Sequence, residues 1–427
     1  MNINSEELVV GSVTAAPQRL TGLDRLCLQG WLPRILIWNC QLDIKLLISS
    51  LKKAIDLYPY VAGRLCSQLD THDFIIANNK GVKFTVDSYN KKIPIDISKE
   101  TIDIYQYDDV DELAHQVDLE SVDENTPLLQ IKLSIFNNGC VLGTTVNHGL
   151  MDGMARFNFM SAWSDFANSE IPPAPDLDRW HLQERANRDD ITVETDYYLS
   201  EDKQLPSETK CNYDILKMDI FFINKLIEGV KKHQLKNEFI SKQDVIHAYL
   251  WSLIVDDESS KDSETTTFTL IYDFRKRCDL STYYFSNAYE VLNITKPVEK
   301  ISNASIYEIA RYIRSTINSL SQEKILSNLC FLGSNEAYGK NEMMRRKDVE
   351  INQSGCLFVA NDTKFHYCNI DFGSETPIYS SRLLPSKYRF KSPYICINEC
   401  PSFDGSVICE IALPEKNMQH VKCSWMQ

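Results

Sequence analysis

The sequence has few basic residues, and no run of them is large enough to counter its excess of acidic ones. Its 427 residues include 59 Asp and Glu against 45 Lys and Arg, which gives a formal net charge of -14. Because neutralisation of phosphates supplies most of the affinity for nucleic acids, this balance argues against a nucleic acid partner. The same charge disfavours an anionic membrane surface. We therefore expect neither partner.

The sequence also lacks paired cysteines and long apolar segments. Its 13 cysteines are scattered, with no C-x-x-C pair and no His/Cys cluster at metal-ligand spacing. This pattern argues against a zinc site and a disulfide framework, and it predicts buried thiols in a reducing compartment. No signal peptide and no stretch of about 18 uncharged apolar residues is recognisable. We expect a soluble, cytoplasmic, monomeric protein without a bound metal.

The length predicts two domains, because single hydrophobic cores stop growing well below 427 residues. The composition changes at residues 171–175, which read IPPAP, and a polar stretch follows to about Pro206. Proline can neither continue a helix nor pair within a sheet. We place the first domain at 1–175, a crossover linker at 176–210 and the second domain at 211–427.

Helical and strand patterns occur on both sides of this linker, which predicts an α/β protein. A helix with one apolar face is expected from Asp43, its cap, to Leu57, and a hairpin over residues 130–147 turns at NNG, residues 137–139. The further expected elements are strands at 73–77, 80–86 and 266–272 and helices beginning near Gly153, Phe222, Ser241 and Ser305. Ser241 and Ser305 each precede an acidic residue at capping-box spacing.

Among the eight histidines, His148 has the setting most typical of a catalytic residue. It follows an apolar strand where the chain turns into a helix, and rigid strand ends often present catalytic side chains to a cleft. We expect His115 and His247 to be packing or surface residues within helices, and His366 to lie in a strand.

A neutral imidazole at His148 can take a proton from a hydroxyl or amine that attacks a carbonyl, without an acyl-enzyme intermediate. Asp152 follows four residues later. It could orient His148, or it could turn away and pair with an arginine. The neighbourhood offers too few ligands for a metal.

These residues resemble a known family. HGLMDG at 148–153 resembles the HxxxDG motif of the BAHD acyltransferases, which move an acyl group from acyl-coenzyme A (acyl-CoA) to an alcohol or amine. Four other segments are similar to family motifs in the expected order: YPYVAGRL at 58–65, SKQDVIHAYLW at 241–251, DFRKR with YFSNA at 273–288, and DFG at 371–373.

The resemblance implies two chloramphenicol-acetyltransferase-like domains, each a mixed sheet with flanking helices, and an active site at their interface. It implies acyl-CoA as co-substrate, with no permanently bound cofactor, and a small-molecule acceptor. His148 is then the general base. Asp152 and Gly153 shape its turn, with Asp152 paired to Arg275 or Arg277. Asp371 and Gly373 would hold a loop at a distance from the chemistry.

The chain also departs from the family pattern. DFGWG has become DFGSE, Ser286 replaces a glycine, and residues 360–363 read ANDT where relatives often carry a Thr/Ser and Trp pair that binds the oxyanion. Asn361 and Thr363 are the candidate oxyanion donors. Lys242 is a weak candidate for the CoA phosphates, because helix N-termini favour anions.

Two alternatives stay open. One is a condensation-type enzyme with a carrier-bound acyl donor, although Asn147 stands where such enzymes have a first histidine. The other is a non-catalytic acyl-CoA-binding relative.

Overall fold

A computed structural model describes most of the 427-residue chain. The described residues are 5–68, 72–93, 101–107, 109–117, 122–188, 190–194, 197–200, 210–255, 264–334, 343–346, 356–384 and 392–426.

The first half of the chain builds a mixed six-stranded sheet in the order β1-β6-β7-β8-β3-β15. Only the β6/β7 pair is parallel. The strands are β1 (Ser5–Val9), β3 (Trp31–Trp38), β6 (Val82–Ser88), β7 (Leu129–Phe136), β8 (Gly139–Asn147) and β15 (Tyr379–Arg382). The last strand therefore comes from the range that we assigned to the second domain.

The second half builds another mixed six-stranded sheet, in the order β10-β17-β16-β14-β11-β12. β14 runs parallel to both β16 and β11. The strands are β10 (Asn212–Met218), β11 (Thr265–Asp273), β12 (Tyr289–Pro297), β14 (Cys356–Asn361), β16 (Tyr394–Glu399) and β17 (Val407–Leu413). Small sheets pair β9 (Tyr197–Ser200) with β13 (Met343–Arg346), and β2 (Gln18–Arg19), β5 (His72–Ile76) and β4 (Arg64–Gln68).

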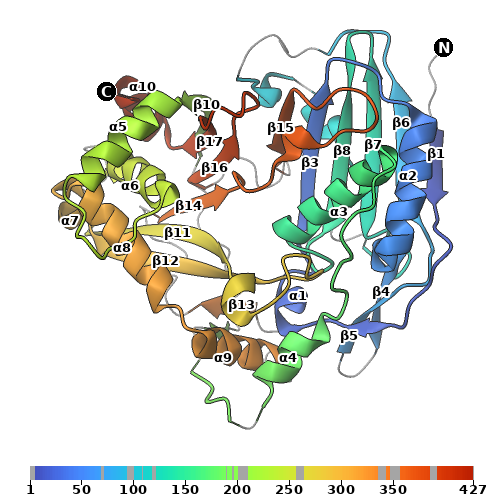
Figure 1. The fold of residues 1–427 in the computed structure, drawn as a ribbon, viewed down its shortest axis with the longest axis horizontal. Helices are drawn as coiled ribbons and strands as arrows, with labels where there is room; N and C mark the ends of the chain where they lie inside the picture. The colour runs from blue at the N-terminus through green and yellow to red at the C-terminus, as the bar shows by residue number, and fades with distance from the viewer. Residues whose placement is uncertain are drawn as a thin grey trace.

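Helices flank both large sheets, so the predicted α/β class with two domains of mixed sheet and helices is confirmed. α2 and α3 cross one face of the first sheet, and α5 to α8 lie beside the second (Figure 1). The helices are α1 (Gly22–Leu26), α2 (Ile44–Leu57), α3 (Gly153–Ala167), α4 (Trp180–Ala186), α5 (Ile220–Lys231), α6 (Lys242–Val255), α7 (Val298–Ser302), α8 (Ile306–Ser319), α9 (Gln322–Gly333) and α10 (Glu415–Ser424).

The elements with clear local signals form where the sequence predicts them. Asp43 caps α2 by accepting from two backbone N–H groups, and the hairpin of β7 and β8 turns at 137–138. Ser305 caps α8 in a capping box with Glu308. Ser241 and Asp244 bond reciprocally at the start of α6. Each cap satisfies backbone donors that the first helical turn leaves unpaired.

Two expectations about histidines were wrong. His115 follows a short 3₁₀ helix in irregular chain, and His366 also lies outside any strand. The stretch taken as a linker contains α4. Both α4 and α1 pack against α9.

A buried apolar cluster joins the two halves of the chain. It combines Ile35 and Ile37 of β3 and Tyr379 of β15 with Ile215 of β10 and Ile408 of β17. Burial of this surface holds the two sheets together, since each buried aliphatic side chain contributes about 1.5–3 kcal/mol. No helix within the described ranges is long and apolar enough to cross a membrane.

Candidate active site

A cavity of about 510 Å³ lies between the two halves of the chain and has a mainly apolar lining. The first half contributes Trp31 at the start of β3, His148 after β8 and the beginning of α3. The second half contributes the N-terminal part of α6, the end of β11 and the segment after β14. His148 and residues of both halves therefore face one space, as expected of a site at a domain interface.

The backbone around His148 is fixed from two sides. Its N–H donates to Gly30 O at 2.8 Å, and its carbonyl accepts from Asn287 Nδ2 at 2.8 Å. The preceding Asn147 is fully buried and bonds to Leu28 O and to Gly149 N–H. The turn that carries the imidazole is therefore held on a rigid strand end.

Burial lowers the pKa of His148 and outweighs the opposing effects of its own backbone and of Asp152. Repulsion by Arg382 and Arg156 adds to the lowering. Its ring lies 5.7 Å from that of Tyr289, centroid to centroid. The buried Nδ1 has no side-chain hydrogen-bond partner among the described residues. A neutral imidazole facing the cavity can accept a proton.

Asp152 joins the two halves of the chain. It caps α3 through Ala155 N–H, accepts the N–H of Ala288, and receives two hydrogen bonds from Arg275, each 2.8 Å long. Arg277 instead donates to Ile317 O and lies over the Tyr272 ring. Of the two arginines left open by the sequence, Arg275 forms the pair.

Gly153 and the DFG segment are packed tightly beside this turn. A Cβ on Gly153 would lie 3.0 Å from the Phe365 ring, which leaves little room for a larger residue. The backbone of Asp371 bonds to Ser164, and Gly373 adopts φ +78°, which favours glycine. Phe372 packs against two tryptophans. Asp371 and Gly373 lie outside the cavity wall.

The two candidate oxyanion donors belong to a polar cluster on the cavity wall. Asn361 Nδ2 donates to Gln243 Oε1 at 2.7 Å and lies 3.3 Å from His247 Nε2. Thr363 Oγ1 donates to Asn361 Oδ1 at 2.7 Å and accepts from Gln243 Nε2. The Thr363 hydroxyl donates to Asn361, and the Asn361 amide group donates to Gln243. An oxyanion role for either residue therefore stays a prediction.

His247 was expected to be a packing or surface residue in a helix. It is buried within α6, and burial lowers its pKa to about 4, so it is neutral at pH 7. Because it also lines the cavity, sequence reasoning underestimated its place in the site.

Lys242 starts α6, as expected, but its ammonium group donates to Gly405 O at 2.6 Å and it lies outside the cavity wall. Its contact with CoA phosphates stays a prediction. Within the described ranges, no group of three or more His, Cys, Asp or Glu could hold a metal ion.

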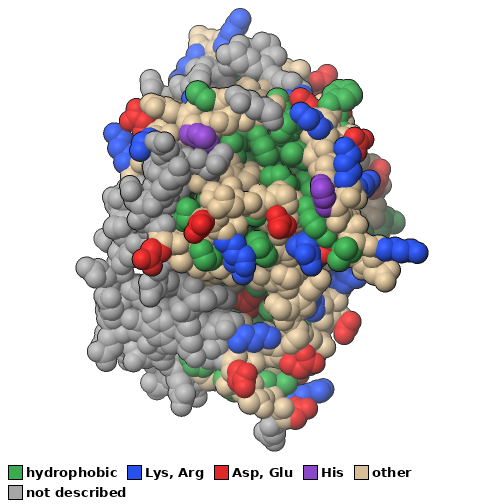
Figure 2. Space-filling view, turned by 90° about the vertical axis from the view of Figure 1, so that its left-hand side faces the viewer, with side chains coloured by type: hydrophobic (Ala, Val, Ile, Leu, Met, Phe, Trp, Pro, Cys, Tyr) green, Lys and Arg blue, Asp and Glu red, His purple; other side chains and the backbone are tan. Residues whose placement is uncertain are grey.

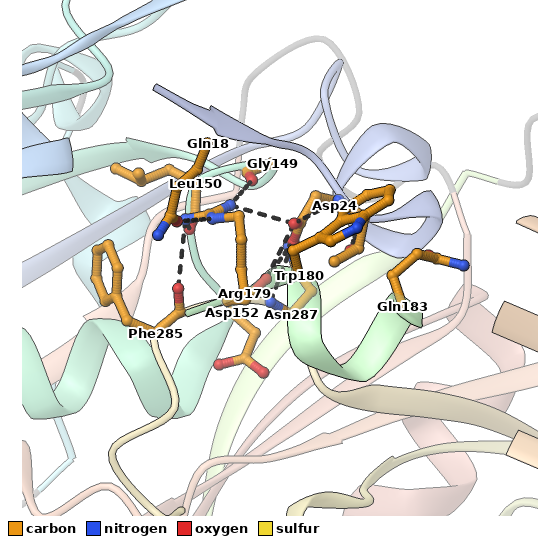
Figure 3. Close-up of polar contacts among 12 residues, drawn as sticks. Gln18, Asp24, Gly149, Leu150, Asp152, Arg179, Trp180, Gln183, Phe285 and Asn287 are labelled. Carbon is orange, nitrogen blue, oxygen red and sulfur yellow. Dashed lines mark hydrogen bonds and ion pairs between the residues drawn. The ribbon is translucent and has the colours of Figure 1, made fainter. Parts of the chain in front are cut away.

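Sequence reasoning missed a buried ion pair next to the His148 turn. Asp24 of α1 and Arg179, which precedes α4, are both 0% exposed and lie 3.1 Å apart. Figure 3 shows Arg179 between Asp24 and the backbone of the turn. Arg179 donates to three carbonyls, those of Gly149, Leu150 and Phe285.

Asp24 gathers the other side of this network. It accepts from Ser286 Oγ and from both the backbone and side-chain nitrogens of Asn287, which itself holds the His148 carbonyl. Thr21 and Asp24 also form the capping box of α1. The Thr-x-x-Asp spacing could have indicated the start of this helix. Nothing in the sequence indicated that Asp24 contacts residues more than 100 positions away.

Comparison with known proteins places these features in context. The sequence model of the Transferase family matches residues 38–426. Phenolic glucoside malonyltransferase 2 of Arabidopsis thaliana is 24% identical over 48% of this chain. That match covers 49% of the relative, so the chain spans about half the length of this relative. Anthranilate N-benzoyltransferase protein 1 of Dianthus caryophyllus is 24% identical over 79% of this chain and 76% of its own.

Solved structures share the fold. Vinorine synthase aligns with TM-score 0.73 and 16% identity over 99% of this chain and 97% of its own. TRI101 of F. sporotrichioides, in complex with coenzyme A and T-2, aligns with TM-score 0.79 and 17% identity over 95% and 97% of the two chains.

Proposed function

Because the chain belongs to the Transferase family, that of the BAHD acyltransferases, we propose that it moves an acyl group from acyl-CoA to a hydroxyl or amine of a small molecule. The observation that carries this proposal is the neutral His148 imidazole in a cavity between the two halves of the chain. The coenzyme A complex of TRI101 supports the donor class.

In the proposed reaction, His148 takes the proton of the acceptor while the oxygen or nitrogen of the acceptor attacks the thioester carbonyl. The tetrahedral intermediate then collapses, and the leaving thiolate of coenzyme A takes that proton from the imidazolium. Both substrates are bound together, so no acyl-enzyme forms. General base catalysis of this kind contributes about 10²–10⁴-fold.

A covalent route through the thiol of Cys27 is disfavoured. Cys27 lies with its sulfur 3.1 Å from the Tyr289 hydroxyl, and Tyr289 lines the cavity. Burial raises the pKa of Cys27 to about 12. The residue is therefore a thiol at neutral pH, and thiols are poor nucleophiles.

The acyl group and the acceptor are open within this class. The names of the relatives include malonyl, benzoyl and hydroxycinnamoyl transfer, and the acceptors that they name are a phenolic glucoside, anthranilate and tryptamine. We propose these acyl-CoA classes and phenolic or amine acceptors as the first panel. Cytoplasmic location and a monomeric state stay predictions from the sequence, as do the linker bounds.

An acyl-CoA by acceptor screen, read by mass spectrometry, tests the proposal. A new ester or amide together with equimolar free coenzyme A supports it. Transfer only from an acylated carrier protein would instead favour a condensation-type enzyme, and tight acyl-CoA binding without transfer or hydrolysis would favour a binding protein.

A further inference from the structure

Three arginines meet beside the cavity, and we call Arg34, Arg156 and Arg382 the arginine cluster. Arg34 and Arg156 are buried, and Arg382 is partly buried. Arg34 of β3 and Arg382 of β15 are direct neighbours across the antiparallel strand pair. Both form ion pairs with Asp362, which is 2% exposed, and Arg382 Nε donates to it at 2.7 Å. One carboxylate thus serves two guanidinium groups.

Arg156 of α3 has no carboxylate partner within the part of the chain that the structure describes. It is 4% exposed, and its hydrogen bonds are to neutral groups: Nε donates to the Tyr367 hydroxyl at 3.2 Å, and Nη1 donates to Leu32 O at 2.9 Å. Among the described residues, no acidic oxygen lies within 4.0 Å of it. A buried guanidinium left without an anion is unfavourable, because desolvation is not repaid.

The positive charge of the cluster exceeds its negative charge. Burial alone would raise the pKa of Asp362, but attraction by Arg382 and Arg34 lowers it to about 2. This carboxylate is therefore ionised. Glu410 lies nearby, but burial raises its pKa to about 7, so it is only partly ionised at neutral pH. Burial lowers the pKa of Arg156, and repulsion by Arg34 and Arg382 adds to this.

This excess is local. The whole chain carries a net charge of -14. On the side of the molecule shown in Figure 2, acidic and basic side chains are interspersed. Of the other arginines beside the cavity, Arg275 pairs with Asp152 and Asp273, and Arg314 pairs with Asp244. Lys364 also lines the cavity. The arginine cluster therefore stands out as a cationic part of the site.

Arg156, Asp362 and Arg382 line the same cavity as His148. We propose that Arg156, with Arg382, binds a carboxylate carried by one of the two substrates, so that the transferase selects an anionic acyl group or an anionic acceptor. This inference rests on the proposed function. A planar guanidinium presents paired N–H donors that match the two oxygens of a carboxylate.

The first test uses the wild-type enzyme and matched substrate pairs. The donor arm compares malonyl-CoA with the neutral acetoacetyl-CoA, and the acceptor arm compares anthranilate with anthranilamide. Loss of a charged partner typically lowers affinity about 10-fold or more. We expect kcat/KM to favour the carboxylate by at least about that factor in one arm, and that arm identifies the substrate. A difference below about 3-fold in both arms would overturn the inference.

The second test replaces Arg156. R156Q removes the positive charge. R156K keeps the charge but lacks the paired N–H donors of the guanidinium group. We expect R156Q to lower the ratio of kcat/KM for the carboxylate substrate to kcat/KM for its neutral counterpart, whatever its effect on the neutral substrate, and R156K to retain part of that ratio. R311Q is the matched control, because Arg311 pairs with Glu238 on the exposed face of α8. Equal preference in R156Q and wild type would contradict the role of Arg156.

The proposed function and the proposed selection of a carboxylate can fail separately. If no substrate pair is turned over, the proposed function fails, and calorimetric titration of the wild-type protein with malonyl-CoA and acetoacetyl-CoA still tests donor selection. If neutral pairs are turned over without any carboxylate preference, only the inference fails. The wild-type measurements also stand if R156Q does not fold, as judged by circular dichroism.

Discussion

Asp152 directs its carboxylate to Arg275: each oxygen accepts a guanidinium hydrogen bond of 2.8 Å. None of the described hydrogen bonds joins Asp152 to His148. The aspartate thus connects the start of α3 to the 3₁₀ helix Arg275–Cys278 of the second half. It shapes the turn that carries the base and does not orient the imidazole directly.

Replacing Asp152 with asparagine should destabilise the protein and slow transfer. The variant leaves Arg275, 3% exposed, with its best partner removed. Breaking a buried ion pair on one side typically costs about 3–5 kcal/mol. Urea unfolding followed by tryptophan fluorescence would measure the loss. R277Q is the control, since Arg277 makes one hydrogen bond to a carbonyl and a cation–π contact with Tyr272. An equal loss in both variants would contradict the assignment.

Replacing Asp24 with asparagine should lower kcat with little change in KM for acyl-CoA. Asp24 and Arg179 hold the backbone of the His148 turn, so the variant loosens the base without touching the donor. D43N is the matched control, because Asp43 is exposed and asparagine caps helices about as well as aspartate. Steady-state kinetics check this, and a rise in KM at constant kcat would sink the idea.

The acid limb of the pH profile should lie below pH 6.5. A general base must be neutral, and burial lowers the pKa of His148 from its ordinary value of 6.5. We therefore expect kcat/KM to stay level as the pH falls to 6.5 and to decline only at lower pH. Transfer rates between pH 5 and 8 measure this. A limb centred above pH 7 would point to a different base.

Stability should decrease on acidification because burial favours the neutral form of two histidines, the buried His247 and the partly buried His115. Burial lowers the pKa of His247 and of His115 to about 4 in the folded state, against 6.5 as the ordinary value. The unfolded chain therefore binds more protons between these values, and the stability present above pH 6.5 is lost as pH falls towards 4. For His247 the loss is on the order of 3 kcal/mol.

Denaturant unfolding at pH 7 and pH 5 checks this expectation. H247Q cannot take up the proton, so its free energy of unfolding should vary less over this range than that of the wild type. An H247Q profile as steep as the wild-type profile would assign the pH dependence to other groups.

The sequence was informative where the signal is local. The caps of α2 and α8, the hairpin before His148 and the turn from Asp152 into α3 each depend on residues within a few positions of one another. A seven-residue helix such as α4 offers too few turns for a periodic pattern, and proline-rich chain precedes it.

Pairings across the fold had no such signal. Asp24 meets Arg179 over 155 positions, and Arg34 meets Asp362 over 328. The choice between Arg275 and Arg277 depended on the 3₁₀ helix that carries both, because residues two apart there point in different directions. Only the folded chain shows which buried charges lack a partner of opposite charge among the described residues, as Arg156 does.

The central claim is that His148 removes the acceptor proton in a direct transfer. The measurement that tests it most directly is the single-turnover rate of H148A and H148Q with a substrate pair found in the screen, with acyl-CoA binding measured in parallel. We predict a fall of about 10²–10⁴-fold with unchanged acyl-CoA affinity and fold. A rate within about 10-fold of the wild type, in folded protein that binds acyl-CoA, would contradict it.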